Sequence, residues 1–481
     1  MPLIRTSGGC ANAGLFCALL LAGCASAGKR ADVAGNESRP TKLAAAASRP
    51  ESARAHLRVS PASVPSAIKT VGYEEPEDDC IRVVDDGAEL FAGQETLDLP
   101  QLVGEVQRRN PSVSAALAAW GAAAERCPQV VTLDDPTLLA MVAPASLWPN
   151  NQRSYIISLS QKLPWSGKLD LRGRVAEWSA VAASFDHDEV QLRLAEAARL
   201  AYYDYFHVNR RLDLNDAGRE AVQSFRETAR SRFEANQAQQ QDVLQADVEL
   251  GKLEQRRIDL DQLLQVAVAR INTLLHRDPD LPLPPPPEQL ENPTALPSVA
   301  ELRERAIGQR PDLAALQARL NSEQNSLALT IREYYPDVEI MGRYDTFWTD
   351  PNQRSQIGMN MNIPLNRQRR DAAVREATFR VNKLQAEYDR EVDLVKNEVQ
   401  GAYARLAAGR RTVQLYADRI LPTAEDNVAA ATSAYTAGTV DFLRLVQTQR
   451  ELIELKENYQ QALVDFQRNR AELDRVVGTL R

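Results

Sequence analysis

The chain has 481 residues, of which 25% are charged, and its formal net charge is −8. This length exceeds that of one ordinary compact core, so we expect two units or an elongated molecule. The acidic balance argues against a nucleic-acid partner, which would usually require a basic excess or patch. No apolar run reaches the length of a membrane-spanning helix.

The N-terminus has the features of an export signal over residues 1–23. A short apolar run, Ala13–Gly23, follows a single positive charge. It ends in Leu21–Cys24, which resembles the lipobox of bacterial lipoproteins, where the cysteine is acylated and becomes the first mature residue. Ala25–Ala27 would instead suit an ordinary signal peptidase, but the end of the apolar run favours the lipobox. We therefore predict a covalent lipid on Cys24 and no other cofactor.

Residues 24–95 are rich in Ala, Ser, Pro and charge without sustained periodicity, which predicts an N-terminal tether. Two cysteines besides Cys24, Cys80 and Cys127, remain after the signal is removed. An exported compartment permits a disulfide between them, but two free thiols are an equal alternative.

An internal repeat with a shift of about 200 residues organises the rest of the chain. Three steps into proline recur at a shift of 200: Asn110-Pro111 with Arg310-Pro311, Asp135-Pro136 with Tyr335-Pro336, and Leu163-Pro164 with Ile363-Pro364. Later matches keep the order, with Tyr202 against Tyr403 at 201 and Asp242–Leu244 against Asp441–Leu443 at 199. We predict a first repeat over 96–276, a Pro-rich linker over 277–297 that is not helical, and a second repeat over 298–481.

Each repeat is expected to hold a helix, two strands and then two long helices. The four strand-like runs are 137–143, 154–163, 338–346 and 356–364. In the last run Ile357, Met359 and Met361 alternate with polar residues. Such alternation suits a soluble sheet with its apolar face on a core, or a barrel strand with lipid outside and water inside. Four strands cannot close a membrane barrel alone, so the second alternative requires an oligomer.

The predicted helices are long enough to form rods. The helical pattern from about Gly167 to Phe233 corresponds to a length of roughly 100 Å. The following helices carry apolar residues at alternating three- and four-residue spacing, which indicates a coiled-coil seam with no chemical role. Pro422 lies inside the first rod of the second repeat, where the first repeat has Ala221. A kink is therefore predicted in the second repeat only.

The turns between rods carry residues suited to ending and starting helices. Asn236 and Gly438 can adopt the left-handed conformation that ends a helix. Asp242 and Asp441 are each predicted to be the N-cap of the next helix. In an oligomer these two carboxylates would also form acidic rings that favour cations.

Motifs for catalysis are absent from the sequence, which contains no phosphate loop, paired-cysteine motif or nucleophile elbow. The nearest metal candidate is Asp186–Glu189, which we interpret as a solvated helix face. The four histidines are too scattered to form a ligand cluster by spacing: His56, His187, His207 and His276. We expect no enzyme and no bound metal.

The duplicated plan and its motifs resemble the TolC-like outer-membrane efflux proteins, with a weaker similarity to the heavy-metal efflux branch. The motifs are "RRNP", "DDPTLL", "SQKLPWSGKL", "YYPDVEI", "NIPLNRQRRDAAVREA", "YTAGTVDFL" and the lipobox. The resemblance implies a homotrimer with a shared β-barrel and a periplasmic α-barrel of long antiparallel helices, a mainly α fold with a small β part. It also implies outer-membrane lipid, a periplasmic adaptor and an inner-membrane pump, of the resistance-nodulation-division type, as partners.

The resemblance also implies roles for residues at both ends of the rods. Pro164 and Pro364 would mark where a barrel strand gives way to a periplasmic helix. Asp242 and Asp441 would line the periplasmic aperture, and the adaptor would dock on Asn236, Gly438 and Thr439.

Three functions are compatible with these features. The first is a passive exit duct for small toxic solutes or metal cations, and the second is a type I protein-secretion duct. The third is a lipid-anchored coiled-coil scaffold without a channel. No residue pattern encodes the substrate.

Cys24→Ser should abolish incorporation of radiolabelled palmitate, because the thiol is the predicted acylation site. Labelling of the immunoprecipitated protein in growing cells measures this, with the Cys80→Ser variant as the matched control. Persistent labelling of Cys24→Ser would mean that another residue carries the lipid.

Overall fold

A computed structural model describes residues 90, 91, 93–143, 154–290 and 297–479. The predicted signal peptide, Cys24, Cys80 and most of the predicted tether lie outside these residues. Contacts divide the chain into the units Met1–Asp78 and Asp79–Arg481, and every described residue belongs to the second unit.

The order of elements confirms the duplication. The first repeat contains α1 (Leu99–Arg109), α2 (Pro111–Ala124), α3 (Arg126–Val131), β1 (Thr137–Val142), β2 (Tyr155–Leu163), α4 (Lys168–Glu234) and α5 (Gln240–Leu274). The second contains α6 (Val299–Gln309), α7 (Pro311–Arg332), β3 (Val338–Asp345), β4 (Ser355–Met361), α8 (Arg367–Leu415), α9 (Leu421–Thr436) and α10 (Phe442–Val477). More than one helix precedes the strands of each repeat, where the sequence pattern predicted a single helix.

The four strands form one antiparallel sheet in the order β1-β2-β3-β4. Each repeat contributes a hairpin, and the pairing of Leu163 with Val338 is part of the β2–β3 ladder that joins the repeats. Within the described residues β1 and β4 each have a neighbour on one side only. The sheet therefore ends in two open edges.

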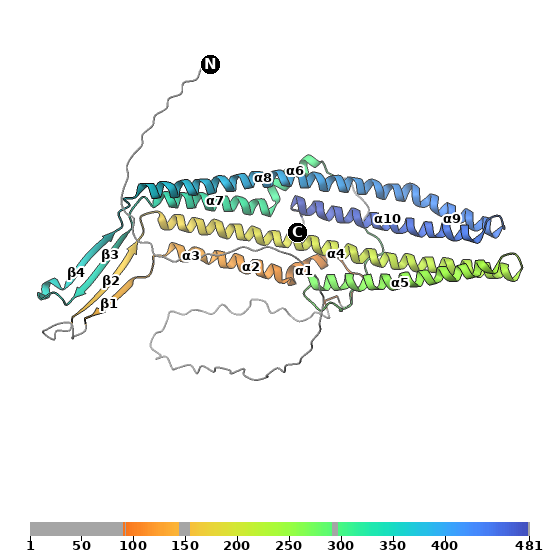
Figure 1. Cartoon of the computed structure of the whole chain (residues 1–481), viewed down its shortest axis with the longest axis horizontal. Coiled ribbons are helices and arrows are strands. Elements are labelled where there is room, and N and C mark those ends of the chain that lie inside the picture. The colour runs from red at the N-terminus through yellow and green to blue at the C-terminus, as the bar shows by residue number, and fades with distance from the viewer. Residues whose placement is uncertain (1–89, 92, 144–153, 291–296, 480–481) are drawn as a thin grey trace, which may run out of the picture. The chain divides into compact units, whose positions relative to one another are not determined.

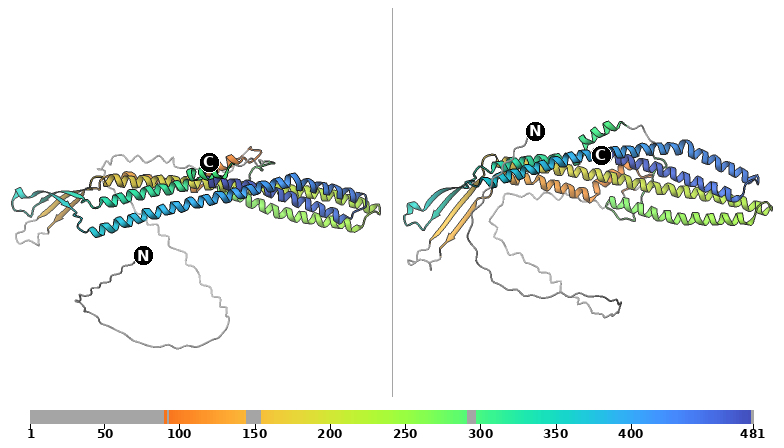
Figure 2. Two further views of the ribbon diagram at one scale, coloured as in Figure 1. Left: turned by 90° about the horizontal axis from the view of Figure 1, so that it is seen from above. Right: turned by 45° about the horizontal axis from the view of Figure 1, so that its top comes forward.

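The long helices lie side by side and the sheet lies at one end of them (Figure 1). α4 has 67 residues, which corresponds to about 100 Å. Gly218 does not interrupt it. The glycine allows close packing, since a Cβ there would lie 2.7 Å from Ile453 Cδ1 of α10. A second view shows the same helices running alongside one another (Figure 2). None of the helices in the described parts of the chain has the length and apolarity needed to cross a membrane.

Both prolines at the sheet boundary lie between a strand and a helix, but neither begins the helix. β2 ends directly before Pro164, and α4 begins only at Lys168, after Gly167 in a left-handed conformation (φ 85°). Pro364 likewise precedes α8 by three residues, and Asn366 caps that helix by accepting from the Arg369 N–H (3.1 Å). Neither proline therefore lies in the first turn of the following helix. Glycine and asparagine start the two helices instead.

The predicted asymmetry between the rods is confirmed. α4 is continuous, whereas a π-helical turn over Tyr416–Ile420 separates α8 from α9, directly before Pro422. A widened turn relieves the clash of the proline ring with the preceding turn. It also absorbs one additional residue, because Tyr403 follows Tyr202 by 201 residues whereas Gly438 follows Asn236 by 202.

The alignment of the two helical hairpins, α4–α5 and α9–α10, differs from the predicted one. Asn236 and Gly438 both have positive φ and lie 202 residues apart, as do His276 and Gly478 at the far ends of α5 and α10. The superposition of Asp242 on Asp441 at a shift of 199 was therefore wrong. Three residues turn a helix by about 300°, so apolar stripes nearly coincide at either shift.

The described part of the Pro-rich linker is extended and bonded to the helices. The Leu97 N–H donates to the Pro285 carbonyl (2.9 Å), and the Tyr205 hydroxyl donates to the Pro284 carbonyl (3.0 Å). Phe91, at the end of the predicted tether, is buried in the same core as α1. These contacts hold the segment between the repeats against the middle of the rods.

The two left-handed residues at 276 and 478 give a matched test of backbone strain. His276→Gly should raise the melting temperature, because an exposed non-glycine residue at φ 54° costs about 1 kcal/mol. Gly478→Ala should lower it more strongly, since the added Cβ would lie 3.1 Å from the Gln309 backbone at φ 83°. Thermal unfolding followed by circular dichroism measures both variants. Equal shifts of the same sign would contradict this reasoning.

Candidate functional site

One face of the sheet is apolar and exposed. The strand register brings Leu138, Leu159 and Ile357 into one row, with Gly342 between them. Neighbouring rows on this face add further exposed apolar side chains: Val142, Ile157, Ile340 and Met359. Ile357 is 91% exposed. The apolar face therefore does not lie on a core of this chain, as the soluble-sheet alternative would require.

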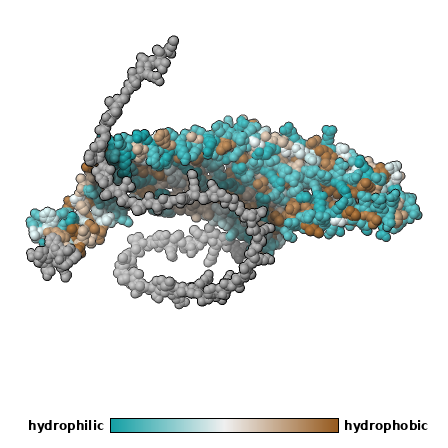
Figure 3. All heavy atoms as spheres, viewed as in Figure 1, coloured by the Kyte–Doolittle hydropathy of each residue, from teal (hydrophilic) through white to brown (hydrophobic). Residues whose placement is uncertain are grey.

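The opposite face is mostly polar. One row across three strands consists of Ser158, Arg343 and Gln356, and another consists of Lys162, Glu339 and Asn360. The Asn360 amide donates to Glu339 (3.3 Å), and Arg343 pairs with Asp345 (2.7 Å). An apolar face backed by a polar one is the pattern of a membrane-barrel wall. Figure 3 shows hydrophobic residues on the sheet, while hydrophilic residues cover most of α8.

Aromatic residues lie at both ends of this sheet. Trp165 stacks on Tyr335 at the helical end (5.4 Å between ring centroids), and Tyr155 approaches Tyr344 at the far end (6.1 Å). The nine residues of β2 span about 30 Å along the strand. At the usual barrel tilt this corresponds to a height of roughly 25 Å, which is that of an apolar band between aromatic girdles.

A buried ion pair joins the two repeats where the sheet meets the helices. Lys168, only 4% exposed, donates from Nζ to Asp337 Oδ1 (2.8 Å) and to the Tyr335 carbonyl (3.1 Å). The Trp165 N–H donates to the same carboxylate (2.9 Å). Burial would raise the pKa of Asp337, but the hydrogen bonds from Lys168 and Trp165 outweigh it and hold the pKa below its ordinary range.

The opposite end of the helices, the helical tip, is formed by the turns after α4 and α9. Asn236 and Gly438 end these helices in the left-handed conformation, as predicted, and the Gln237 and Thr439 N–H groups close the turns. Asp441 is an N-cap, because its side chain accepts from the Arg444 N–H (3.1 Å). Asp242 is not: α5 begins at Gln240, so Asp242 lies in the first turn and the capping prediction for it was wrong.

Arg232 connects the two turns of the tip. Its guanidinium lies over the Tyr435 ring (4.8 Å) and donates to the Tyr435 carbonyl. Asp242 lies on the same groove of about 390 Å³ together with Asp441. Burial and the nearby Asp441 raise the pKa of Asp242, while Arg232 opposes the shift. The tip thus holds two carboxylates and one arginine close together.

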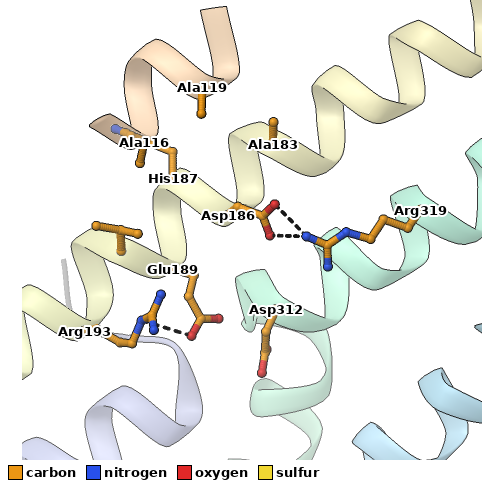
Figure 4. A pocket seen from close by; sticks show the side chains of 10 residues that line it. Ala116, Ala119, Ala183, Asp186, His187, Glu189, Arg193, Asp312 and Arg319 are labelled. Carbon is orange, nitrogen blue, oxygen red and sulfur yellow. Dashed lines mark hydrogen bonds and ion pairs between the residues drawn. The ribbon is translucent and has the colours of Figure 1, made fainter. Parts of the chain in front are cut away.

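The Asp186–Glu189 segment, interpreted from sequence as a solvated face, lies on a small cavity between α2, α4 and α7 (Figure 4). Arg319 donates to both carboxylate oxygens of Asp186 (2.6 and 2.7 Å), and Glu189 forms an ion pair with Arg193 (3.4 Å). Burial and the neighbouring Asp312 raise the pKa of Glu189. Across the described parts of the chain no group of three potential metal ligands is found. The Asp186–Arg319 pair ties α4 to α7.

Sequence comparison gives two matches. Residues 302–479, in the second repeat, match the family described as outer membrane efflux protein. The cobalt-zinc-cadmium resistance protein CzcC of Cupriavidus metallidurans is 28% identical over 193 residues, or 38% of this chain and 44% of CzcC. The match thus spans less than half the length of this curated relative.

Solved structures with the same fold cover most of the chain. The outer-membrane channel OprN aligns with a TM-score of 0.68 at 20% identity, over 81% of this chain and 91% of its own. CusC aligns with a TM-score of 0.68 at 15% identity, over 80% and 93%. The fold is therefore TolC-like, mainly α with a small sheet. The family match lies in the second repeat, and the first repeat contains the same pair of strands followed by long helices.

Loss of the Lys168–Asp337 pair should destabilise the protein in a pH-dependent way. Lys168→Met leaves a carboxylate without its partner and should cost about 3 kcal/mol at pH 7. Because the folded pKa of Asp337 is lowered, its stabilisation is complete above the unfolded pKa and is lost as the pH falls below about 4. The melting temperatures of wild type and variant should thus converge as the pH falls through the lowered pKa of Asp337. Arg230→Met, which removes an exposed pair with Glu234, is the control and should change little.

Proposed function

We propose that the chain is the outer-membrane exit duct of a tripartite efflux system. The exposed apolar sheet face with two open edges carries this proposal. A sheet in lipid must pair all its backbone groups, so it must close into a barrel. One chain supplies four strands, and three chains would supply twelve, enough for a closed barrel.

The helices suggest how the duct continues. α4 and α8 each leave the same end of the sheet (Figure 1). In a trimer they would extend the barrel by roughly 100 Å as a helical tube in the periplasm. A periplasmic adaptor would dock on the tip at Asn236, Gly438 and Thr439, and an inner-membrane pump would supply the energy.

The substrate class we propose is small toxic solutes or metal cations. The partial similarity to CzcC, a cobalt-zinc-cadmium resistance protein, supports the cation alternative. The similar fold of OprN, an outer-membrane channel, supports a duct. So does the similar fold of CusC, whose structures are described in terms of transmembrane channel formation. A scaffold without a channel would give no reason for the exposed Ile357 and Leu159. Lipid on Cys24 would add an anchor in the outer membrane.

Conductance of the purified protein in planar bilayers tests this function. Wild type should insert and give discrete current steps. A double variant, Leu159→Asp with Ile357→Asp, places charge on the proposed lipid face and should insert rarely. Ser158→Asp with Gln356→Asp changes the opposite face and should still insert. Absence of wild-type current in lipid, with intact helical content, would contradict the duct and favour a scaffold.

The acidic pair at the tip should set ion selectivity. Asp441→Asn and Asp242→Asn should each reduce the preference for cations, measured as a reversal-potential shift in a salt gradient. Asp441→Asn keeps most of the cap, whereas Asp441→Ala should lose about 1 kcal/mol of stability. Asp242→Asn should not destabilise the tip, because burial and the nearby Asp441, which raise the pKa of Asp242, both disfavour its charge. Unchanged selectivity in both Asn variants would leave Asp441 as a helix cap only.

A further inference from the structure

The joint between the two repeats is closed by charge within the chain. β2 ends beside the start of β3, where Leu163 pairs with Val338. Lys168 is the first residue of α4, and Asp337 is the residue just before β3. The basic residue that opens a long helix therefore neutralises the acidic residue that precedes the neighbouring strand. We call this arrangement the inner joint.

The outer edges of the sheet carry the same two kinds of residue without a partner. Arg367 is the first residue of α8, and Arg369 follows it, close behind the end of β4. Asp134 and Asp135 lie just before β1. All four side chains are exposed. Within the described ranges their charged groups make no hydrogen bond or ion pair.

Sheet topology brings these charges to corresponding places. β1 runs parallel to β3 in direction and antiparallel to β4, since every neighbouring pair is antiparallel. If chains are related by rotation about a barrel axis, β4 of one chain meets β1 of the next in the antiparallel sense. The residues after Met361 then lie beside the residues before Thr137 of the next chain. The Gln161 amide holds that segment in place through the Asp134 carbonyl (2.7 Å).

We propose that Asp134 and Asp135 of one chain form ion pairs with Arg367 and Arg369 of the next, which makes each outer joint a second version of the inner one. The occupant of this surface is thus a second copy of the chain. The proposal rests on the proposed function, since it needs a barrel shared between chains. These ion pairs would select β1 of the next chain as the neighbour of β4 and align the two strands.

The apolar residues around the charges fit the same arrangement. At a shift of 200, Leu365 takes the place of Trp165, and Asp135-Pro136 take the place of Tyr335-Pro336. At the inner joint Trp165 stacks on Tyr335. Leu365 is 85% exposed, and Leu133 is exposed beside the two aspartates. A neighbouring chain would cover both leucines.

Charge complementarity favours a second chain over anionic lipid. Lipid headgroups would suit the two arginines, but they would be repelled by Asp134 and Asp135 at the same end of the sheet. A second chain uses both signs at once. The pairing also opposes wrong associations, because β1 meeting β1 of another chain would bring like charges together.

Charge reversal in the full-length protein tests the pairing. One variant carries Arg367→Asp and Arg369→Asp, a second carries Asp134→Arg and Asp135→Arg, and a third carries all four changes. Each double variant should lose about tenfold or more of the trimer that survives in mild detergent, measured by native mass spectrometry. The fourfold variant should recover it. Arg230→Asp with Glu234→Arg, on the exposed face of α4, is the control and should leave the trimer unchanged.

Cysteine cross-linking tests the geometry independently of stability. In a background of Cys80→Ser and Cys127→Ser, Asp135→Cys combined with Arg367→Cys should give covalent dimers and trimers on oxidation. Neither single variant should do so. Mixing chains with two different tags should link the tags, which identifies the bond as one between chains.

The outcomes separate this proposal from the proposed function. A wild-type trimer that withstands both double reversals, or a fourfold variant no better than either, would overturn the charge pairing and leave the duct intact. Loss of the trimer only in the arginine variant would point to lipid and would also overturn it. A wild type that conducts no current and forms no trimer would overturn both.

Discussion

The backbone of a sheet edge sets the constraint on which the molecule depends. Each strand of the edge carries N–H and C=O groups that lack partners, and each such group in lipid costs several kcal/mol. β4 has seven residues, so its free edge alone would cost more than about 10 kcal/mol in a membrane. That exceeds the total stability of many domains. An apolar sheet with two open edges therefore fits a membrane only when other chains close it.

Duplication supplies the parts for such closure. Because each repeat holds a hairpin, the inner joint is an intramolecular version of the joint that we propose between chains. The inner joint contains the buried Lys168 and the stacked rings of Trp165 and Tyr335. The proposed outer joint contains Arg367 and Asp135, whose side chains are exposed. A long-range charge suits a contact that must form between separate molecules, whereas a buried pair suits one that forms during folding.

Sequence periodicity predicted most of the fold because its signals are local. The alternation around Ile357 located β4, and the proline steps at 111, 164, 311 and 364 gave the period of the repeat. The tip was harder. Asp242 precedes an apolar seam and has the residue type of a cap, yet Gln239 occupies that position since the turn is set by Asn236. An apolar stripe that repeats every three or four residues fits both alignments of the repeats. It therefore could not show that the predicted shift was three residues too small, or that Asp242 was not the cap.

The partners of side chains could not be predicted from patterns within one strand or helix. Lys168 looked like one of several basic residues after Pro164, and nothing local indicated that Asp337, 169 residues away, would bury it. Arg232 likewise contacts Tyr435 across 203 residues. Such contacts follow from the register of β2 on β3 and from the packing of the two hairpins, which are properties of the assembled fold. Where a side chain has a partner within the described residues, the structure reveals it. Arg367 and Asp135 have none there, and the pairing that we propose for them would come from a neighbouring chain.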